Sequence, residues 1–335
     1  MMGKTKYIIL MIVAVMLIFI AACGADTTSP PDVSVGAETQ VDTGDDLAAQ
    51  SDEHGSPAGQ TIVGRDGSAI KLPDRIDTII SMGPSNTEIL VALGLSEKII
   101  AVDSFSDNIP GLDSNLPMFD MIAPDGEQIL SMMPDVIFLP GMVLAAADDP
   151  FRVLSDAGIC LIYIPSSTSI EGIMDDIRFI AYVMGVGERA GEIVSDMAEA
   201  VDRIRGIGET IEERRSVYFE VSPSPHLVSF GTGVFLNEMI EIIGASNVLA
   251  EDIDGWRSIS DEVILAADPD VILTSVNFID DPVGEIMERT GWSGITAVRD
   301  GAVHFIDTDA SNRPSHNIVR ALQEMAVAIY PEYFQ

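Results

Sequence analysis

Residues 262–272 read Glu-Val-Ile-Leu-Ala-Ala-Asp-Pro-Asp-Val-Ile, and residues 127–137 read Glu-Gln-Ile-Leu-Ser-Met-Met-Pro-Asp-Val-Ile. The shared phrase is Glu-x-Ile-Leu-x-x-x-Pro-Asp-Val-Ile, and its copies lie 135 residues apart (262 − 127). Each copy predicts a short helix that ends before the proline and leads into a buried strand. A period this long indicates two copies of a domain-sized unit and not a solenoid. We therefore expect two similar lobes, with a ligand between them.

Apolar, β-branched runs around both copies predict further strands. In the first half, strands are expected at residues 77–82, 99–102, 136–139 and 160–164, after a hairpin at 61–72; in the second half they are expected at 216–221, 271–274 and 302–306. Helical patterns lie between them. One has Ser85 or Asn86 as its expected N-cap and Gly94 as its expected C-cap, and another runs from Ser315, its expected N-cap, to Tyr330. Because strands alternate with helices, the sequence predicts an α/β fold with parallel sheets covered by helices.

The stretch between the two halves contains no strand signal. From residue 169 to about 215, apolar side chains form a helical stripe and charged side chains fill the opposite face. A long helix here would be a rigid spine. We therefore expect an N-terminal α/β lobe at residues 59–168, a helical spine at 169–215 and a C-terminal α/β lobe at 216–335.

The N-terminus carries the pattern of a targeting segment. Lys4 and Lys6 precede 16 apolar residues that end at Ala22, too few for an ordinary membrane span. Cys23 follows directly, and the site resembles a bacterial lipobox. The resemblance implies a signal peptide at residues 1–22 and lipidation of Cys23, which would anchor the protein outside the cell membrane. The alternative is an ordinary secretory signal with a chance cysteine.

Residues 23–58 have almost no large apolar side chains, so they cannot bury a core and are expected to form a disordered tether. The chain has 18 basic and 53 acidic residues, a formal net charge of −35. Such a surface repels nucleic acid and anionic lipid, so a nucleic-acid partner is excluded. The charge fits adaptation to high salt, but it also fits a merely acidic extracytoplasmic protein.

Five stretches, taken in order, resemble a known family. They are Ser-Met-Gly-Pro-Ser-Asn-Thr-Glu at 81–88, the two repeat phrases, Trp-Ser-Gly-Ile-Thr-Ala-Val-Arg-Asp-Gly at 292–301 and Arg-Pro-Ser-His-Asn-Ile-Val-Arg-Ala-Leu at 313–322. Over residues 60–335 the chain looks like a class III (cluster A) solute-binding lipoprotein of ABC importers, from the iron-siderophore and cobalamin group. The resemblance implies two Rossmann-like lobes with central sheets, joined by one long α-helix, and a ligand cleft between the lobes.

The resemblance also implies partners, namely an ABC permease dimer and its ATPase. In this family one surface glutamate of each lobe docks onto arginines of the permease, and Glu127 and Glu262 hold the matching places. Two equivalent carboxylates suit a transporter built from two equivalent subunits. The simpler alternative is that each glutamate is favoured in a first helical turn by the helix dipole.

Ligands of α/β lobes meet the loops at the carboxyl ends of the strands. Trp256 is the leading candidate there, because it lies in a polar loop where the family places an aromatic ligand contact. Arg313 is the leading charged candidate, since arginine can pair bidentately with an anionic group. The other candidate ligand-binding residues are Asn86, Phe119, Met121, Met142, Phe278, Arg257 and His316.

Aromatic and methionine side chains dominate these candidates, and few are basic. They favour a bulky, weakly charged metal chelate, such as cobalamin or a ferric hydroxamate siderophore, over a catecholate siderophore. Haem is an alternative, because Tyr163 and His316 could reach an iron. No cofactor of the protein's own is expected, although the ligand itself would carry Fe³⁺ or cobalt.

Other functions find little support in the sequence. An extracytoplasmic enzyme would need a nucleophile elbow, a phosphate-binding loop or a cluster of metal-binding side chains, and none of these motifs is present. A zinc or manganese carrier would need several well-placed histidines, whereas the chain has 4 in all. A lipid-anchored adhesion protein would show exposed apolar strands or repeats instead of a cleft.

Overall fold

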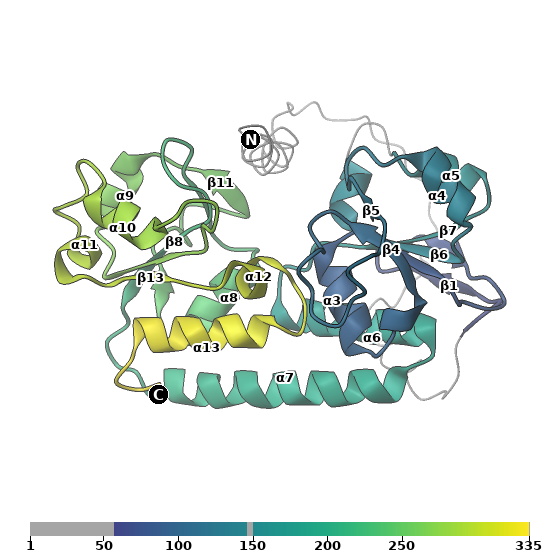
Figure 1. Cartoon of the computed structure of the whole chain (residues 1–335). Helices are drawn as coiled ribbons and strands as arrows, with labels where there is room; N and C mark the ends of the chain where they lie inside the picture. The colour runs from purple at the N-terminus through teal and green to yellow at the C-terminus, as the bar shows by residue number, and fades with distance from the viewer. Residues whose placement is uncertain (1–56, 146–149, 335) are drawn as a thin grey trace, which may run out of the picture.

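The computed structural model describes residues 57–145 and 150–334. The predicted signal peptide, Cys23 and nearly all of the predicted tether lie outside the described residues. The predicted α/β fold is confirmed: two parallel sheets stand at opposite ends of one long helix (Figure 1). In the described part of the chain, no helix has both the length and the apolar character needed to cross a membrane.

The N-terminal lobe contains a five-stranded sheet in the order β5-β4-β3-β6-β7. Its strands are β3 (Ile79–Ser81), β4 (Ile99–Asp103), β5 (Met118–Phe119), β6 (Val136–Pro140) and β7 (Cys160–Ile164). The helices of this lobe are α3 (Pro84–Ala92), α4 (Gly126–Met132) and α5 (Arg152–Asp156), with short 3-10 turns at Ser96–Lys98 and Gly141–Ala145. The predicted hairpin is present as β1 (Thr61–Val63) and β2 (Ala69–Lys71).

The C-terminal lobe contains a four-stranded sheet in the order β10-β8-β12-β13. Its strands are β8 (Ser216–Glu220), β10 (Ser246–Asn247), β12 (Val271–Thr274) and β13 (Val303–Phe305), and a separate hairpin pairs β9 (Val228–Phe230) with β11 (Trp256–Ser258). The helices are α8 (Phe235–Ile242), α9 (Asp261–Ala267), α10 (Pro282–Glu288), α11 (Thr296–Asp300), α12 (Thr308–Asn312) and α13 (Ile318–Ile329).

The two repeat phrases form equivalent helix-to-strand connections, one in each lobe. Helices α4 and α9 end on Met133 and Asp268, which have left-handed backbone conformations with φ of 47° and 44°. The aspartate of each Pro-Asp pair then accepts a hydrogen bond at the start of the neighbouring strand, from the residue before β3 or from the first residue of β8. Asp135 accepts from the amide of Thr78 at 2.9 Å, and Asp270 accepts from the amide of Ser216 at 2.8 Å. The repeat therefore joins β3 to β6 and β8 to β12 in equivalent ways.

The predicted spine is two helices. Helix α6 (Ile170–Met184) ends at Gly185, which has φ of 69°, and α7 (Gly187–Gly208) follows. With 22 residues, α7 is about 33 Å long and runs beneath both lobes (Figure 1). The sequence pattern predicted helix as far as residue 214, and this is wrong because α7 ends at Gly208. There the backbone approaches the end of α8 so closely that a Cβ on Gly208 would lie 2.3 Å from the carbonyl oxygen of Ile242.

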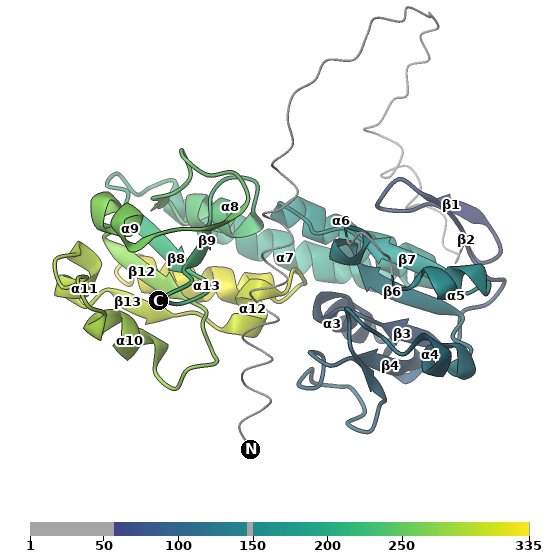
Figure 2. The same ribbon diagram turned by 90° about the horizontal axis from the view of Figure 1, so that it is seen from above.

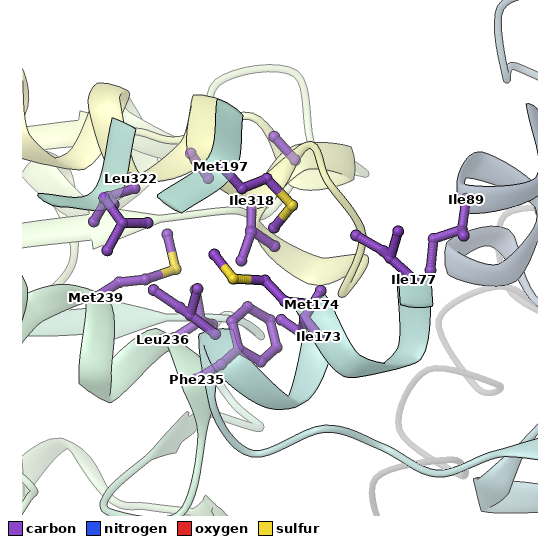
Figure 3. Close-up of a cluster of buried hydrophobic side chains, with 14 of the residues drawn as sticks. Ile89, Ile173, Met174, Ile177, Met197, Phe235, Leu236, Met239, Ile318 and Leu322 are labelled. Atoms are coloured by element: carbon purple, nitrogen blue, oxygen red, sulfur yellow. The ribbon is translucent and has the colours of Figure 1, made fainter. Parts of the chain in front are cut away.

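One apolar core connects the lobes. Figure 3 shows side chains from α6, α7, α8 and α13 packed together, with Ile89 of α3 close to Ile177 of α6. All of the labelled residues are buried: Ile89, Ile173, Met174, Ile177, Met197, Phe235, Leu236, Met239, Ile318 and Leu322. Because α6 contributes to this core from the spine, the lobes are joined by packed apolar surface as well as by covalent connections.

Two predicted helix caps are wrong. Helix α3 is capped by Gly83 with Pro84 in its first turn, so neither Ser85 nor Asn86 is the N-cap, although Gly94 does follow the helix with φ of 79°. Helix α13 is capped by Asn317 and not by Ser315. The hydroxyl of Ser315 instead donates to Glu88 of the other lobe, so a tertiary contact replaces the predicted local one.

Candidate functional site

The carboxyl ends of the parallel strands carry the loops between the lobes. Figures 1 and 2 both place α12 of the C-terminal lobe beside α3 of the N-terminal lobe, and Figure 1 shows β11 on the side of its lobe that faces the other lobe. A groove of about 1350 Å³ lies elsewhere, on the outer side of the C-terminal lobe between α7, α13 and β13. None of the predicted ligand residues lines that groove. The candidate ligand site is at the strand ends and not in this groove, because the loops at the strand ends come from both lobes.

Trp256 is held by aromatic packing. It lies on the short strand β11 and not in the loop that the sequence predicted, and it pairs in register with Phe230 of β9. The two rings meet edge to face, with centroids 5.4 Å apart and planes at 73°. The indole packs against the apolar core that connects the lobes and stays partly exposed. It therefore offers a fixed aromatic surface.

Arg257 follows Trp256 on the same strand. Side chains alternate along a strand, so Arg257 points to the opposite side of β11 from Trp256. Its side chain is partly exposed, and it forms no ion pair with any residue that the structure describes. Of the two predicted ligand arginines, it is the one without a carboxylate partner.

Arg313 is fully engaged by the protein itself. Its guanidinium pairs with Glu88 at 3.0 Å and with Asp309 at 2.9 Å, and it donates to the carbonyl oxygen of Phe105 at 3.1 Å. A further bond reaches Asn108 at 3.0 Å, and the side chain is only 13% exposed. An anionic ligand would have to displace these partners before it could bind Arg313.

The candidates from the N-terminal lobe are mostly buried. Phe119 is 4% exposed and Met121 is 8% exposed, so both lack free surface, while Met142 is partly exposed and packs on the core of its lobe. Asn86 is 1% exposed, and its Nδ2 finds no hydrogen-bond partner within the described residues. Phe278 of the C-terminal lobe is partly exposed in the loop after β12. The ligand roles of these five residues stay predictions.

The haem alternative rests on two side chains in different settings. Tyr163 lies on β7 in the buried core of the N-terminal lobe. His316 lies between α12 and α13, where burial lowers the pKa of its imidazole, Glu88 raises it and Arg189 lowers it further. Its Nδ1 has no hydrogen-bond partner among the described residues. Within those residues, no cluster of three or more His, Cys, Asp or Glu side chains could hold a metal ion.

A buried polar chain at the ends of β3 and β4 was not predicted. The hydroxyl of Ser106 donates to Asp103 at 2.6 Å and lies 3.2 Å from the hydroxyl of Thr87, which donates to Ser81 at 2.7 Å. Burial raises the pKa of Asp103 above its ordinary value, against the opposing effect of these bonds and of Arg313. Glu88, next along α3, was also missed. Nothing in the sequence around the two acids marks them as buried, because each follows or precedes several polar residues.

The two predicted docking glutamates occupy equivalent exposed places. Glu127 is the second residue of α4 and Glu262 is the second residue of α9. Neither pairs with a basic side chain in the described ranges 57–145 and 150–334. A hydrogen bond from Ser260 and a backbone amide lower the pKa of Glu262, so it is ionised near neutral pH. Figure 1 shows α4 and α9 on the side of the molecule opposite α7, one on each lobe.

Comparison with known proteins gives consistent matches over most of the chain. A family model described as periplasmic binding protein matches residues 79–310. The uncharacterized ABC transporter substrate-binding lipoprotein YvrC of Bacillus subtilis is 31% identical over 259 residues, covering 77% of this chain and 81% of its own. A cobalamin-binding protein of Halobacterium salinarum is 23% identical over 337 residues, covering 98% of this chain and 86% of its own.

A solved structure with a similar fold is that of the molybdate-binding protein MolA of Haemophilus influenzae, bound to molybdate. It superposes with a TM-score of 0.71 at 23% sequence identity, covering 82% of this chain and 93% of that one. At this level of identity the likeness concerns the fold alone.

Proposed function

The chain belongs to the periplasmic binding protein family of ABC transporters, and from this premise we propose that it captures cobalamin, or failing that a ferric hydroxamate siderophore, outside the cell. The family consists of extracytoplasmic, non-enzymatic binding proteins that deliver solutes to a permease. The proposal therefore concerns which solute is bound, how it is held and how it is delivered.

The state of Arg313 carries the proposal on ligand class. An oxyanion such as molybdate, or a strongly anionic catecholate chelate, needs a cation that is free to pair with it. Arg313 already pairs with Glu88 and Asp309, which cancel its charge locally. Of the leading candidate residues, Trp256 keeps an aromatic face that a ligand could contact, and Arg257 lies on the other side of the same strand. This supports a bulky ligand of low charge, and the cobalamin-binding protein of Halobacterium salinarum is a relative along nearly the whole chain.

Haem is the second candidate, and His316 is the observation that favours it. Because burial lowers the pKa of its imidazole, the ring is neutral at physiological pH, the form that binds iron. Its Nδ1 lacks a partner in the described residues. Tyr163 would have to leave a packed core to complete the pair, so cobalamin ranks first.

Delivery would use Glu127 and Glu262. Their places on α4 and α9 would let one carboxylate address each half of a permease dimer. We also propose that lipidated Cys23 holds the protein at the membrane, which the similarity to the lipoprotein YvrC supports.

A fluorescence titration tests the ligand. Tryptophan emission is followed while cyanocobalamin, a ferric hydroxamate, a ferric catecholate, haemin and molybdate are added in separate experiments. We expect saturable quenching by cyanocobalamin, or by the hydroxamate, and no response to molybdate. Trp256→Phe leaves only the buried Trp292 and reports whether the quenched ring is the one on β11. Binding of molybdate alone, or of no compound, contradicts the proposal.

A further inference from the structure

A polar cluster crosses from one lobe to the other beside α3 and α12. Glu88 of α3 pairs with Arg313 and also accepts hydrogen bonds from Ser315 and, at 2.9 Å, from Asn317. In the reverse direction, Asn108 of the N-terminal lobe donates to Asp309 at 2.6 Å. All of these contacts join residues about 200 or more positions apart in the chain.

Glu88 and Arg313, the two charged residues at the centre of this cluster, are largely buried. The side chain of Glu88 is 6% exposed and that of Arg313 is 13% exposed, and within the described residues their side-chain partners come from the opposite lobe or from α12. A buried ion pair gains little over well-packed apolar groups, but removing one partner leaves an uncompensated buried charge. A small separation of the lobes at this place would break these bonds while both charges are still buried, so the contact resists small changes in the angle between the lobes.

The apolar core shown in Figure 3 differs in kind from this contact. Apolar packing has no direction, and side chains such as Met174, Met197 and Met239 can adapt to a changed fit. The bonds of Arg313 to Glu88, Asp309 and the carbonyl of Phe105 fix distances in several directions. The core thus holds the lobes together, whereas the polar cluster sets how they are oriented.

We propose that Glu88 and Arg313 are a positioning pair that fixes the separation of the two lobes and thereby the width of the ligand site. In this role Arg313 binds the protein and not the cargo. The inference depends on the proposed function only where ligand affinity is measured, because the separation of the lobes can be measured without any ligand.

The test measures a distance across the lobes. Spin labels are attached through Gln128→Cys on α4 and Glu251→Cys in the C-terminal lobe, both at exposed positions, in a chain where Cys23 and Cys160 are replaced by serine. Pulsed dipolar spectroscopy then gives the distribution of label separations. We expect one narrow distribution for the parent chain and a longer, broader one for Glu88→Gln and for Arg313→Met. The double variant should resemble the single variants, because both remove the same interaction.

Affinity provides a second readout. If loss of the pair leaves about a tenth of the molecules in the binding-competent arrangement, the apparent Kd for the ligand identified by titration rises about tenfold. The control is Glu220→Gln, which breaks a buried ion pair with Arg289 inside the C-terminal lobe at 2.7 Å. It should lower the melting temperature without changing the label separation.

Two outcomes overturn the inference. One is an unchanged distance distribution in both Glu88→Gln and Arg313→Met, and the other is equal broadening in Glu220→Gln, which would indicate general loosening. If the central variants do not fold, Asn108→Ala and Asp309→Ala each remove the exposed Asn108–Asp309 bond and one bond to Arg313, but they leave the Glu88–Arg313 pair in place, so they should shift the distance in the same direction by less. Failure to bind cobalamin would leave the distance result intact, so the two proposals can fail separately.

Discussion

Trp256 shows how a single residue can link the core to the proposed ligand site. Its indole edge rests on Phe230, and the rest of the ring is partly open. A side chain fixed in this way loses little conformational freedom when it contacts a ligand, which favours a large contribution to affinity.

Trp256→Ala should therefore weaken binding of the cargo by about 1–2 kcal/mol, or roughly tenfold in Kd. Calorimetric titration of the variant against the parent chain measures this. Trp292→Phe is the matched control: its indole is buried and donates to Asp261 at 2.7 Å, so this change should lower the melting temperature and leave Kd unaltered. Equal affinities for Trp256→Ala and the parent would remove Trp256 from the site.

The hydrogen bonds of Asp135 predict how its contribution to stability depends on pH. Burial raises its pKa, but hydrogen bonds from the amides of Asp77 and Thr78 and from the Thr78 hydroxyl outweigh this and lower it overall. A carboxyl with a lowered folded-state pKa stabilises the fold above its unfolded pKa of about 3.9, and the effect is lost as pH falls through the lower folded value. Asp135→Asn should cost about 1 kcal/mol at pH 7. In urea unfolding, the gap to the parent should shrink toward pH 3; a gap independent of pH would contradict the assignment.

At the scale of elements, the end of α7 depends on two glycines. Gly208 and Gly244 bring the backbones of α7 and the end of α8 into direct contact. Helix α7 stops there although its apolar pattern continues, because the chain must turn against α8 before entering β8.

Gly208→Ala should destabilise the protein by about 1–3 kcal/mol, since its Cβ would lie 2.3 Å from a carbonyl oxygen of α8. Gly206→Ala is the control on the same helix. A Cβ there meets nothing within 4 Å, so the change should stabilise by about 0.5–1 kcal/mol through helix propensity. Thermal unfolding of both variants decides this, and a neutral Gly208→Ala would show that the contact can relax.

The elements predicted well from the sequence are those with local causes. Apolar runs and the Pro-Asp phrases placed the central strands within a few residues, because strand burial and proline geometry act locally. Ser315 was predicted as a cap and is instead a partner of Glu88, 227 residues away. Likewise, Arg313 was predicted to bind ligand, because the sequence gives no sign that Glu88, 225 residues away, pairs with it across the lobes. Contacts of this range leave no local pattern, so only the fold discloses them.

At the scale of the whole molecule, two exposed carboxylates stand on equivalent helices of the two lobes. Glu127→Ala combined with Glu262→Ala should abolish uptake in cells while Kd for the purified protein stays unchanged, because both lie outside the proposed ligand site. Each single variant should retain part of the uptake. The control is Glu199→Ala, an exposed acid on α7 away from both helices. Normal uptake by the double variant would mean that the permease binds another surface.

A crystal structure of the protein with cobalamin bound tests both the proposed site between the lobes and the proposed low charge of the cargo. We expect ligand density against Trp256, between β11 and the loops that follow β3 and β6, with Arg313 still paired to Glu88. Density in the outer groove between α7 and α13, or a ligand held by a released Arg313, would contradict this expectation.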